Sequence, residues 1–207
     1  MNALQPLLVA TRNLGKLEEL RQMLSHLPFD LYGLERFPNV EGILETGGSF
    51  IENASLKAAG YATQTRLLTL ADDSGLEVDA LGGGPGVFSA RYAGEQASDV
   101  ERTTKLLTEL SSVASSRRSA RFVSAVAIAS SEGQILNVSV GTCDGHIAFS
   151  PRGSIGFGYD PIFIPIGYGQ TFAELKPQIK NRISHRARAL VGAREFLRSL
   201  TVASSDR

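Results

Sequence analysis

Several features are scarce in this sequence of 207 residues. It has one cysteine, Cys143, so no disulfide can form within the chain, and its first residues lack the basic segment that opens a secretory signal. We therefore expect a cytoplasmic protein. Lysine and arginine number 21, as do aspartate and glutamate, so no general field exists to hold a nucleic acid polymer. No apolar run approaches the roughly 18 residues that a membrane span needs, and we expect no membrane segment.

The length suits one domain, or one domain with a small lobe, since domains commonly have roughly 150 residues. Strand-like apolar runs lie at 7–10, 67–71, 121–129 and 134–142, and helical periodicity lies at 17–27, 49–61, 98–110 and 183–200. The spacings Ser49 to Glu52 and Ser98 to Glu101 each predict a capping box at a helix start. Ser131-Glu132-Gly133 separates two of the strand runs and indicates an antiparallel hairpin. The sequence therefore predicts an α/β or α+β fold with helices on a mixed sheet, and residues 201–207 as a loose tail.

The glycine-rich segments do not form a familiar nucleotide-binding fingerprint. No hydroxyl residue follows Lys16 as a P-loop requires, and the glycines of 153–158 stand in the wrong order for a dinucleotide site. Residues 11–16 nevertheless lie between a predicted strand and helix, where α/β folds place ligands and helix amides hold anions. Two interpretations remain open here, a phosphate site or simple capping of the helix by Asn13 with a solvated Lys16.

Two adjacent acids, Asp72 and Asp73, follow the strand run 67–71 and are predicted to lie at the end of that strand. Adjacent carboxylates are costly unless a cation or hydrogen bonds offset their repulsion. Mg²⁺ takes one or two carboxylates together with substrate phosphates, and Glu45 can supply the second acid. The alternative is a turn in which an aspartate caps its own backbone.

Two later segments carry an aromatic ring and basic residues. Residues 156–161 predict a tight turn that displays Phe157, whose ring either packs in the core or stacks on a base. Lys180, His185 and Arg186 precede or open the last helix, whose positive end adds to their attraction for an anion. They form a candidate nucleotide clamp, with a solvated basic helix start as the alternative.

Taken together, these motifs resemble those of the inosine triphosphate pyrophosphatase family over about residues 7–197. The matching segments, in family order, are Thr11 to Lys16, Glu45-Thr46-Gly47, Phe50 to Ala54 with Lys57, Ala71 to Gly75, Gly82 to Tyr92, Gly156 to Pro161, and Lys180 with Ser184-His185-Arg186. Each motif is weak alone, but their common order makes the resemblance specific.

The resemblance implies a homodimer of elongated subunits, each with a long central mixed sheet flanked by helices and an active-site cleft between two lobes. Residues 1–200 would form this single pyrophosphatase domain. The implied reaction needs Mg²⁺ and hydrolyses noncanonical purine nucleoside triphosphates (ITP, dITP and XTP) to the monophosphate and pyrophosphate. Such a reaction keeps deaminated purines out of DNA and RNA.

The resemblance also implies site residues. Glu45 and Asp73 match metal-associated carboxylates, and Asp73 matches the general base; Asp72 is left without a definite role. The substrate-binding positions are Thr11, Arg12, Asn13, Leu14, Gly15, Lys16, Lys57, Ser74, Phe157, Gly158, Tyr159, Asp160, Lys180, His185 and Arg186. Arg12 departs from the small residue often found at its position. Donors of the 185–186 segment are expected to face a 6-oxo group of the base and so to disfavour ATP, whose adenine carries a 6-amino group. Guanine has the same 6-oxo group as hypoxanthine, so this contact does not explain rejection of GTP.

Two rival functions were weighed. The septum-associated nucleotide pyrophosphatases have a similar fold, but residues 156–161 and 185–186 argue against that family. A catalytically silent purine nucleotide sensor would be expected to lack Asp73, Glu45 or Lys16, and the sequence has all three.

Overall fold

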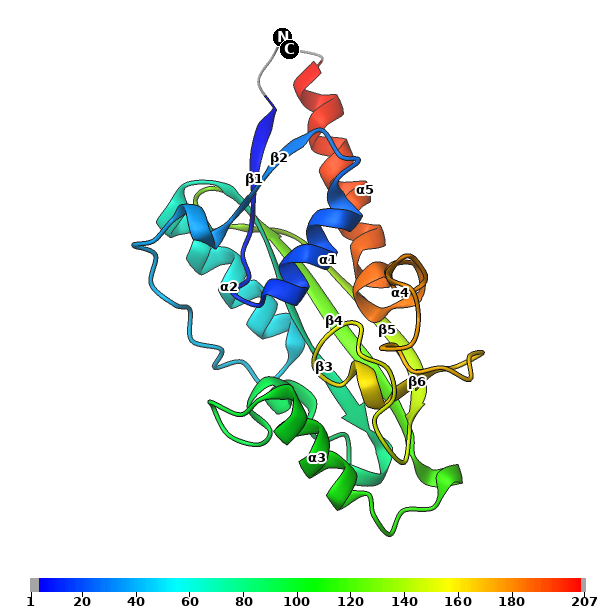
Figure 1. Cartoon of the computed structure of the whole chain (residues 1–207). Coiled ribbons are helices and arrows are strands. Elements are labelled where there is room, and N and C mark those ends of the chain that lie inside the picture. Colours follow the sequence, from blue (N-terminus) through cyan, green and yellow to red (C-terminus); the bar gives the residue numbers. More distant parts are fainter. Residues whose placement is uncertain (1–3, 206–207) are drawn as a thin grey trace. The chain divides into compact units, whose positions relative to one another are not determined.

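A computed structural model describes residues 4–205, which form a sheet and several helices (Figure 1). The strands are β1 (Gln5–Val9), β2 (Phe29–Gly33), β3 (Leu68–Val78), β4 (Ser119–Ala129), β5 (Ile135–Ile147) and β6 (Phe163–Pro165). The helices are α1 (Leu14–Leu24), α2 (Phe50–Thr65), α3 (Asp99–Glu109), α4 (Pro177–Ile183) and α5 (His185–Ser205), with short 3-10 segments at 34–36, 79–81, 86–91, 115–117 and 160–162.

The strands form one mixed sheet in the order β2-β1-β3-β4-β5-β6. β1 pairs in parallel with β2 and with β3, while β5 and β6 are antiparallel. β4 and β5 are neighbours joined by residues 130–134, a connection too short for a parallel crossover, so they form the predicted hairpin. The predicted fold class, helices on a mixed sheet, is confirmed.

The chain divides into two compact units. Unit 1 comprises residues 4–73, 124–141 and 186–205, and unit 2 comprises residues 74–123 and 142–185. Each of β3, β4 and β5 contributes residues to both units.

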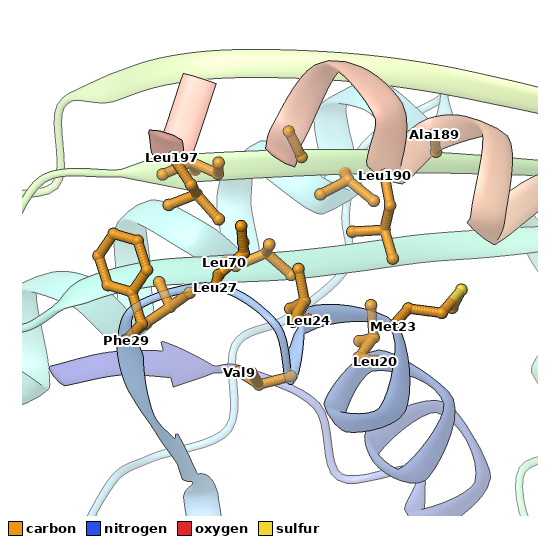
Figure 2. Close-up of a cluster of buried hydrophobic side chains, with 14 of the residues drawn as sticks. Val9, Leu20, Met23, Leu24, Leu27, Phe29, Leu70, Ala189, Leu190 and Leu197 are labelled. Carbon is orange, nitrogen blue, oxygen red and sulfur yellow. The ribbon is translucent and has the colours of Figure 1, made fainter. Parts of the chain in front are cut away.

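Helices α1 and α5 of unit 1 cover one face of the parallel strands. Leu20 and Leu24 of α1 meet Leu190 and Leu197 of α5 over Leu70 of β3 (Figure 2). Buried residues recur at three- to four-residue spacing in both helices, at 17, 20 and 24 in α1 and at 190, 193 and 197 in α5, which gathers them on one side of each helix and explains why this face is buried. No described residue of α2 belongs to this cluster.

Helix α2 has its own buried face of small residues. Ser49 caps its start by accepting a hydrogen bond from the Glu52 amide at 3.2 Å, but the Glu52 carboxylate accepts from the Gly48 amide at 2.7 Å, so only half of the predicted capping box is present. Ala54, Ala58 and Ala62 are fully buried, and their short side chains allow the helix backbone to lie close to its neighbours.

Unit 2 has a separate core rich in phenylalanine. Phe163 lies edge-on to Phe122 at 4.7 Å between ring centroids and 5.2 Å from Phe172. The predicted capping box of α3 is present, because Ser98 and Glu101 each bond the backbone amide of the other. These contacts hold the strand ends and loops of unit 2 in place.

The structure corrects four sequence expectations. β2 is present although the sequence analysis assigned no strand there, and β3 continues to Val78, so Asp72 and Asp73 lie inside the strand and not at its end. Extended backbone at Ser184 separates α4 from α5, which places Lys180 in a short helix of its own. The predicted tail is wrong for residues 201–205, which continue α5, while 206–207 lie outside the described residues. No described helix is long and apolar enough to cross a membrane.

Candidate active site

The loop between β1 and α1 carries the first predicted substrate residues. Asn13 caps α1, since its side chain accepts a hydrogen bond from the Lys16 amide at 2.9 Å, and Thr11 Oγ1 accepts one from the Asn13 amide at 3.2 Å. The Lys16 side chain is only 15% exposed, so the alternative of a solvated lysine is wrong.

The Arg12 side chain donates a hydrogen bond to the Val40 carbonyl at 3.2 Å. In the same segment Leu14 is exposed and Gly15 is partly buried.

The two adjacent aspartates point to opposite faces of β3. Successive side chains alternate along a strand, so Asp72 shares a face with Leu70, which packs against α1 and α5. Asp73 faces the other way and meets Lys57 of α2. The repulsion expected between neighbouring carboxylates is thus relieved by giving each its own cation.

On the α2 face, one lysine joins the two predicted metal carboxylates. Lys57 Nζ donates to Asp73 Oδ1 at 2.8 Å and to Glu45 Oε1 at 3.1 Å. The Asp73 side chain is 8% exposed and that of Glu45 is 32% exposed, so the pair lies at the margin of the buried region. The structure therefore brings together the three residues to which the sequence assigned metal and phosphate chemistry.

The loop that carries Glu45 is fixed by Asn53, a fully buried residue of α2. Asn53 Oδ1 accepts a hydrogen bond from the Gly47 amide at 2.8 Å. A Cβ at Gly47 would stand 2.6 Å from Glu52 Cβ and 2.8 Å from Asn53 Oδ1, so only glycine allows this close approach. Asn53 lies within the motif 50–54, whose sequence gives no sign of this role.

Burial and charge act against each other in this group. Burial raises the pKa of the Asp73 carboxyl above its ordinary value, although Lys57 works in the opposite direction. Burial lowers the pKa of Lys57, but Asp73 and Glu45 outweigh it and the net shift is upward. Lys57 is thus held as an ammonium, while Asp73 is a carboxylate with more than ordinary affinity for a proton.

On the opposite face of β3, Asp72 is the centre of a second ionic cluster. Its Oδ2 lies 2.9 Å from Lys16 Nζ and 3.3 Å from a guanidinium nitrogen of Arg186, and its Oδ1 accepts the Ser124 hydroxyl. Burial alone would raise the pKa of Asp72, but Arg186 and Lys16 hold it well below the ordinary value. Arg186, 1% exposed, also pairs with Glu19 of α1.

The turn at 156–161 in unit 2 is built around a buried carboxylate. Asp160 Oδ2 accepts the Phe157 amide at 3.0 Å and also pairs with Lys180, whose ammonium lies 4.8 Å from the Phe157 ring centroid. Gly156 has φ +87°, and a Cβ there would stand 2.1 Å from Asp160 Oδ2. The predicted tight turn is present, and Phe157 is only partly buried, with a cation beside its ring.

Two other contacts surround this turn. The Gly158 amide donates to Asp99 Oδ2 at 2.7 Å, and the buried Tyr159 hydroxyl donates to the Ser89 carbonyl at 2.9 Å. The sequence analysis missed Asp99, because its link to Gly158 joins segments 59 residues apart.

The remaining predicted residues of unit 2 are Ser74 and His185. Ser74 is a partly buried residue of β3. His185 is 4% exposed and stacks on Phe122, with ring centroids 4.6 Å apart and planes 12° apart. Its ring thus belongs to the packed interior.

Comparison with known proteins identifies the family. The family model described as the Ham1 family matches residues 7–196. The chain belongs to the Ham1 family. A dITP/XTP pyrophosphatase of Geobacter sulfurreducens is 50% identical over 191 residues, which cover 92% of this chain and 96% of that protein.

Further Ham1-family similarities extend over nearly the whole chain. A dITP/XTP pyrophosphatase of Geobacillus kaustophilus is 47% identical over 187 residues, or 90% of this chain and 91% of that one. The solved structure of a HAM1 protein from Coxiella burnetii has a TM-score of 0.80 and 42% identity, covering 98% of this chain and all of that one. The resemblance inferred from the motifs is confirmed.

Proposed function

We propose that this Ham1-family protein hydrolyses noncanonical purine nucleoside triphosphates such as dITP, XTP and ITP to the monophosphate and pyrophosphate. The observation that carries the proposal is the buried Asp73 carboxylate, held by Lys57 beside Glu45. The relatives named dITP/XTP pyrophosphatase, which align over nine-tenths of the chain, support the substrate class.

We propose Mg²⁺ as the cofactor, with Glu45 and Asp73 as its protein ligands. Asp73 Oδ2 is buried and has no hydrogen-bond partner among the described residues, and an oxygen in that state suits a hard cation. Among the described residues, no group of three or more acids, histidines or cysteines is arranged so that it could hold a metal ion. Two carboxylates nevertheless suffice for Mg²⁺, whose other ligands are commonly water and substrate phosphates. When bound, Mg²⁺ supplies positive charge to phosphate oxygens.

The chain's own residues account for the remaining chemistry. Asp73, with its raised pKa, is suited to accept a proton from water as the water oxygen bonds to the α-phosphorus. The bond from that phosphorus to the bridging oxygen breaks, and pyrophosphate leaves. In this proposal Lys16 and Lys57 neutralise phosphate oxygens, whose charge builds as the bond breaks.

Within unit 2, Phe157 is the residue proposed to contact the base. Phe157, partly exposed and flanked by the Lys180 ammonium, offers a ring on which a purine can stack. Donors from the 185–186 segment are expected to favour a 6-oxo group over a 6-amino group, because a mismatched donor would be left unpaired in a buried pocket. A septum-associated type of pyrophosphatase is not favoured, since the relatives compared bear another name.

Assembly and location are also part of the proposal. We propose a homodimer, as the family resemblance implies, and a cytoplasmic location, which agrees with a single buried cysteine. Light scattering of the purified chain tests the first, and a mass of one subunit at micromolar concentration would contradict it.

Product analysis tests the reaction itself. The purified protein is incubated with ITP, dITP, XTP, GTP or ATP in the presence of Mg²⁺, and monophosphate and pyrophosphate are quantified. We expect both products in equal amounts from ITP, dITP and XTP, little from ATP, and none when a chelator removes the metal. Nucleoside diphosphate with orthophosphate as the products would show that attack occurs at another phosphorus.

A further inference from the structure

Asp72 is a buried carboxylate that the proposed chemistry does not use. It is 1% exposed and lies one residue from the general base, but strand alternation turns it to the opposite face of β3. Burial of a charged group at this depth is unfavourable unless other groups compensate it. Its partners therefore indicate its role.

Both oxygens of Asp72 are occupied by donors from three different elements. Ser124 of β4 donates to Oδ1, whereas Lys16 of α1 and Arg186 of α5 both lie within ion-pair distance of Oδ2. Glu19 of α1 holds the other side of the Arg186 guanidinium. The carboxylate is thus a fixed anchor with little capacity for a metal ion.

We infer that Asp72 is a positioning residue that fixes the Lys16 ammonium for the substrate phosphates, and that it is neither a metal ligand nor the base. The inference rests on the proposed function in that Lys16 is taken to bind phosphate.

A lysine ammonium sits on a flexible four-carbon stem and loses entropy when it is ordered. The contact with Asp72 at 2.9 Å restricts that freedom before the substrate arrives. Arg186 and Ser124 restrict the carboxylate in turn, so Lys16 is held through a chain of buried contacts. Preorganisation of this kind lowers the cost of binding.

A double-mutant cycle tests whether Asp72 acts through Lys16. The variants are Lys16→Met, Asp72→Asn, their combination, and Asp73→Asn as the matched change of the neighbouring acid. Two affinities are measured by calorimetry without nucleotide: that for inorganic pyrophosphate, and that for Mn²⁺ alone. Thermal unfolding of each variant shows whether it is folded.

We expect Lys16→Met and Asp72→Asn each to weaken pyrophosphate binding about tenfold, as for a lost charge-assisted hydrogen bond. The double variant should be no weaker than Lys16→Met alone, because two residues that act through one contact are not additive. Mn²⁺ affinity should stay within about twofold for Asp72→Asn and fall at least about tenfold for Asp73→Asn, the loss of an anionic ligand.

Two results would overturn the inference: additive losses in the double variant, or loss of Mn²⁺ binding in Asp72→Asn with pyrophosphate binding intact. If Asp72→Asn does not fold, Ser124→Ala replaces it, since that change removes one hydrogen bond to the carboxylate and keeps every charge. Ser124→Ala should weaken pyrophosphate binding about two- to tenfold in the chain that retains Lys16, and it should have no effect in a chain that also carries Lys16→Met. An unchanged affinity in the chain that retains Lys16 would count against the inference. Neither assay needs turnover, so a protein that shows this cycle but does not hydrolyse ITP would refute the proposed function alone.

Discussion

Replacing Asp73 by asparagine should abolish most turnover and leave the fold intact. Asparagine retains an oxygen where Asp73 Oδ1 accepts from Lys57 at 2.8 Å, and Lys57 keeps its contact with Glu45 at 3.1 Å. Because burial raises the pKa of Asp73, its negative charge is unfavourable in the folded protein. Removing that charge should therefore lower the free energy of unfolding by less than the worth of a hydrogen bond to a charged group, about 1.5 to 3 kcal/mol.

The expected loss of activity is much larger. The amide can neither accept the proton of water nor act as an anionic ligand, and loss of a general base typically lowers rates by about 10² to 10⁴. This corresponds to about 2.7 to 5.4 kcal/mol of activation free energy. The assay compares kcat/KM for dITP and ITP, and urea unfolding measures stability.

The neighbouring acid provides the contrast for the same experiment. Asp72→Asn breaks a buried ionic cluster and should cost about 3 to 5 kcal/mol of stability. Near-native turnover of Asp73→Asn beside a folded but inactive Asp72→Asn would refute the assignment and exchange the roles of the two acids.

Three further outcomes are expected. Asn53→Ala should cost about 1 to 3 kcal/mol of stability, because the Gly47 amide in the loop that carries Glu45 loses its hydrogen-bond acceptor. The Mg²⁺ concentration that gives the half-maximal rate should also rise, and an unchanged Mg²⁺ titration would contradict this expectation. The pKa of Asp72 is lower in the folded protein than in the unfolded chain, so ionised Asp72 stabilises the fold fully above about pH 4 and this stabilisation is lost as the pH falls further. The free energy of unfolding, measured in urea, should therefore fall less steeply with decreasing pH in Asp72→Asn than in the unchanged protein. Equal slopes in the two proteins would refute this expectation. Arg186→Ala removes the buried partner of Asp72 and Glu19 and should cost about 3 to 5 kcal/mol of stability; in the folded variant the ratio of kcat/KM for ITP to that for ATP should fall, whereas an equal loss for both substrates would remove Arg186 from base selection.

Local signals in the sequence predicted the elements whose ends are set by nearby residues. Ser49 and Ser98 start their helices as predicted, because an N-cap needs only a side-chain oxygen and an amide three residues later. The turn at Gly156 was predicted for a similar reason, since its geometry is fixed within a few residues. Neighbouring residues were enough to define these elements.

The extent of β3 was missed because its second half has a composition that local rules assign to turns. Aspartate, serine and glycine are depleted in strands, so the run at 72–75 looks like the end of one. The strand continues because the cations that neutralise its acids come from distant parts of the chain: Lys57 lies 16 residues from Asp73, and Arg186 lies 114 residues from Asp72. Tertiary contacts of this range leave no local signal.

Successive side chains of β3 face opposite ways, and this gives the two adjacent aspartates different chemical environments. One face of the strand gives Asp73 a lysine and a second carboxylate near the protein surface, where water and a cation can reach them. The other face gives Asp72 two cations and a hydroxyl within the interior, where its pKa is driven well below the ordinary value. The same residue type, at adjacent positions, is thereby prepared for proton transfer on one side and for permanent charge on the other. A one-residue shift in the register of β3 would exchange the two environments, so the pairing that fixes this register is as necessary to the proposed reaction as either acid.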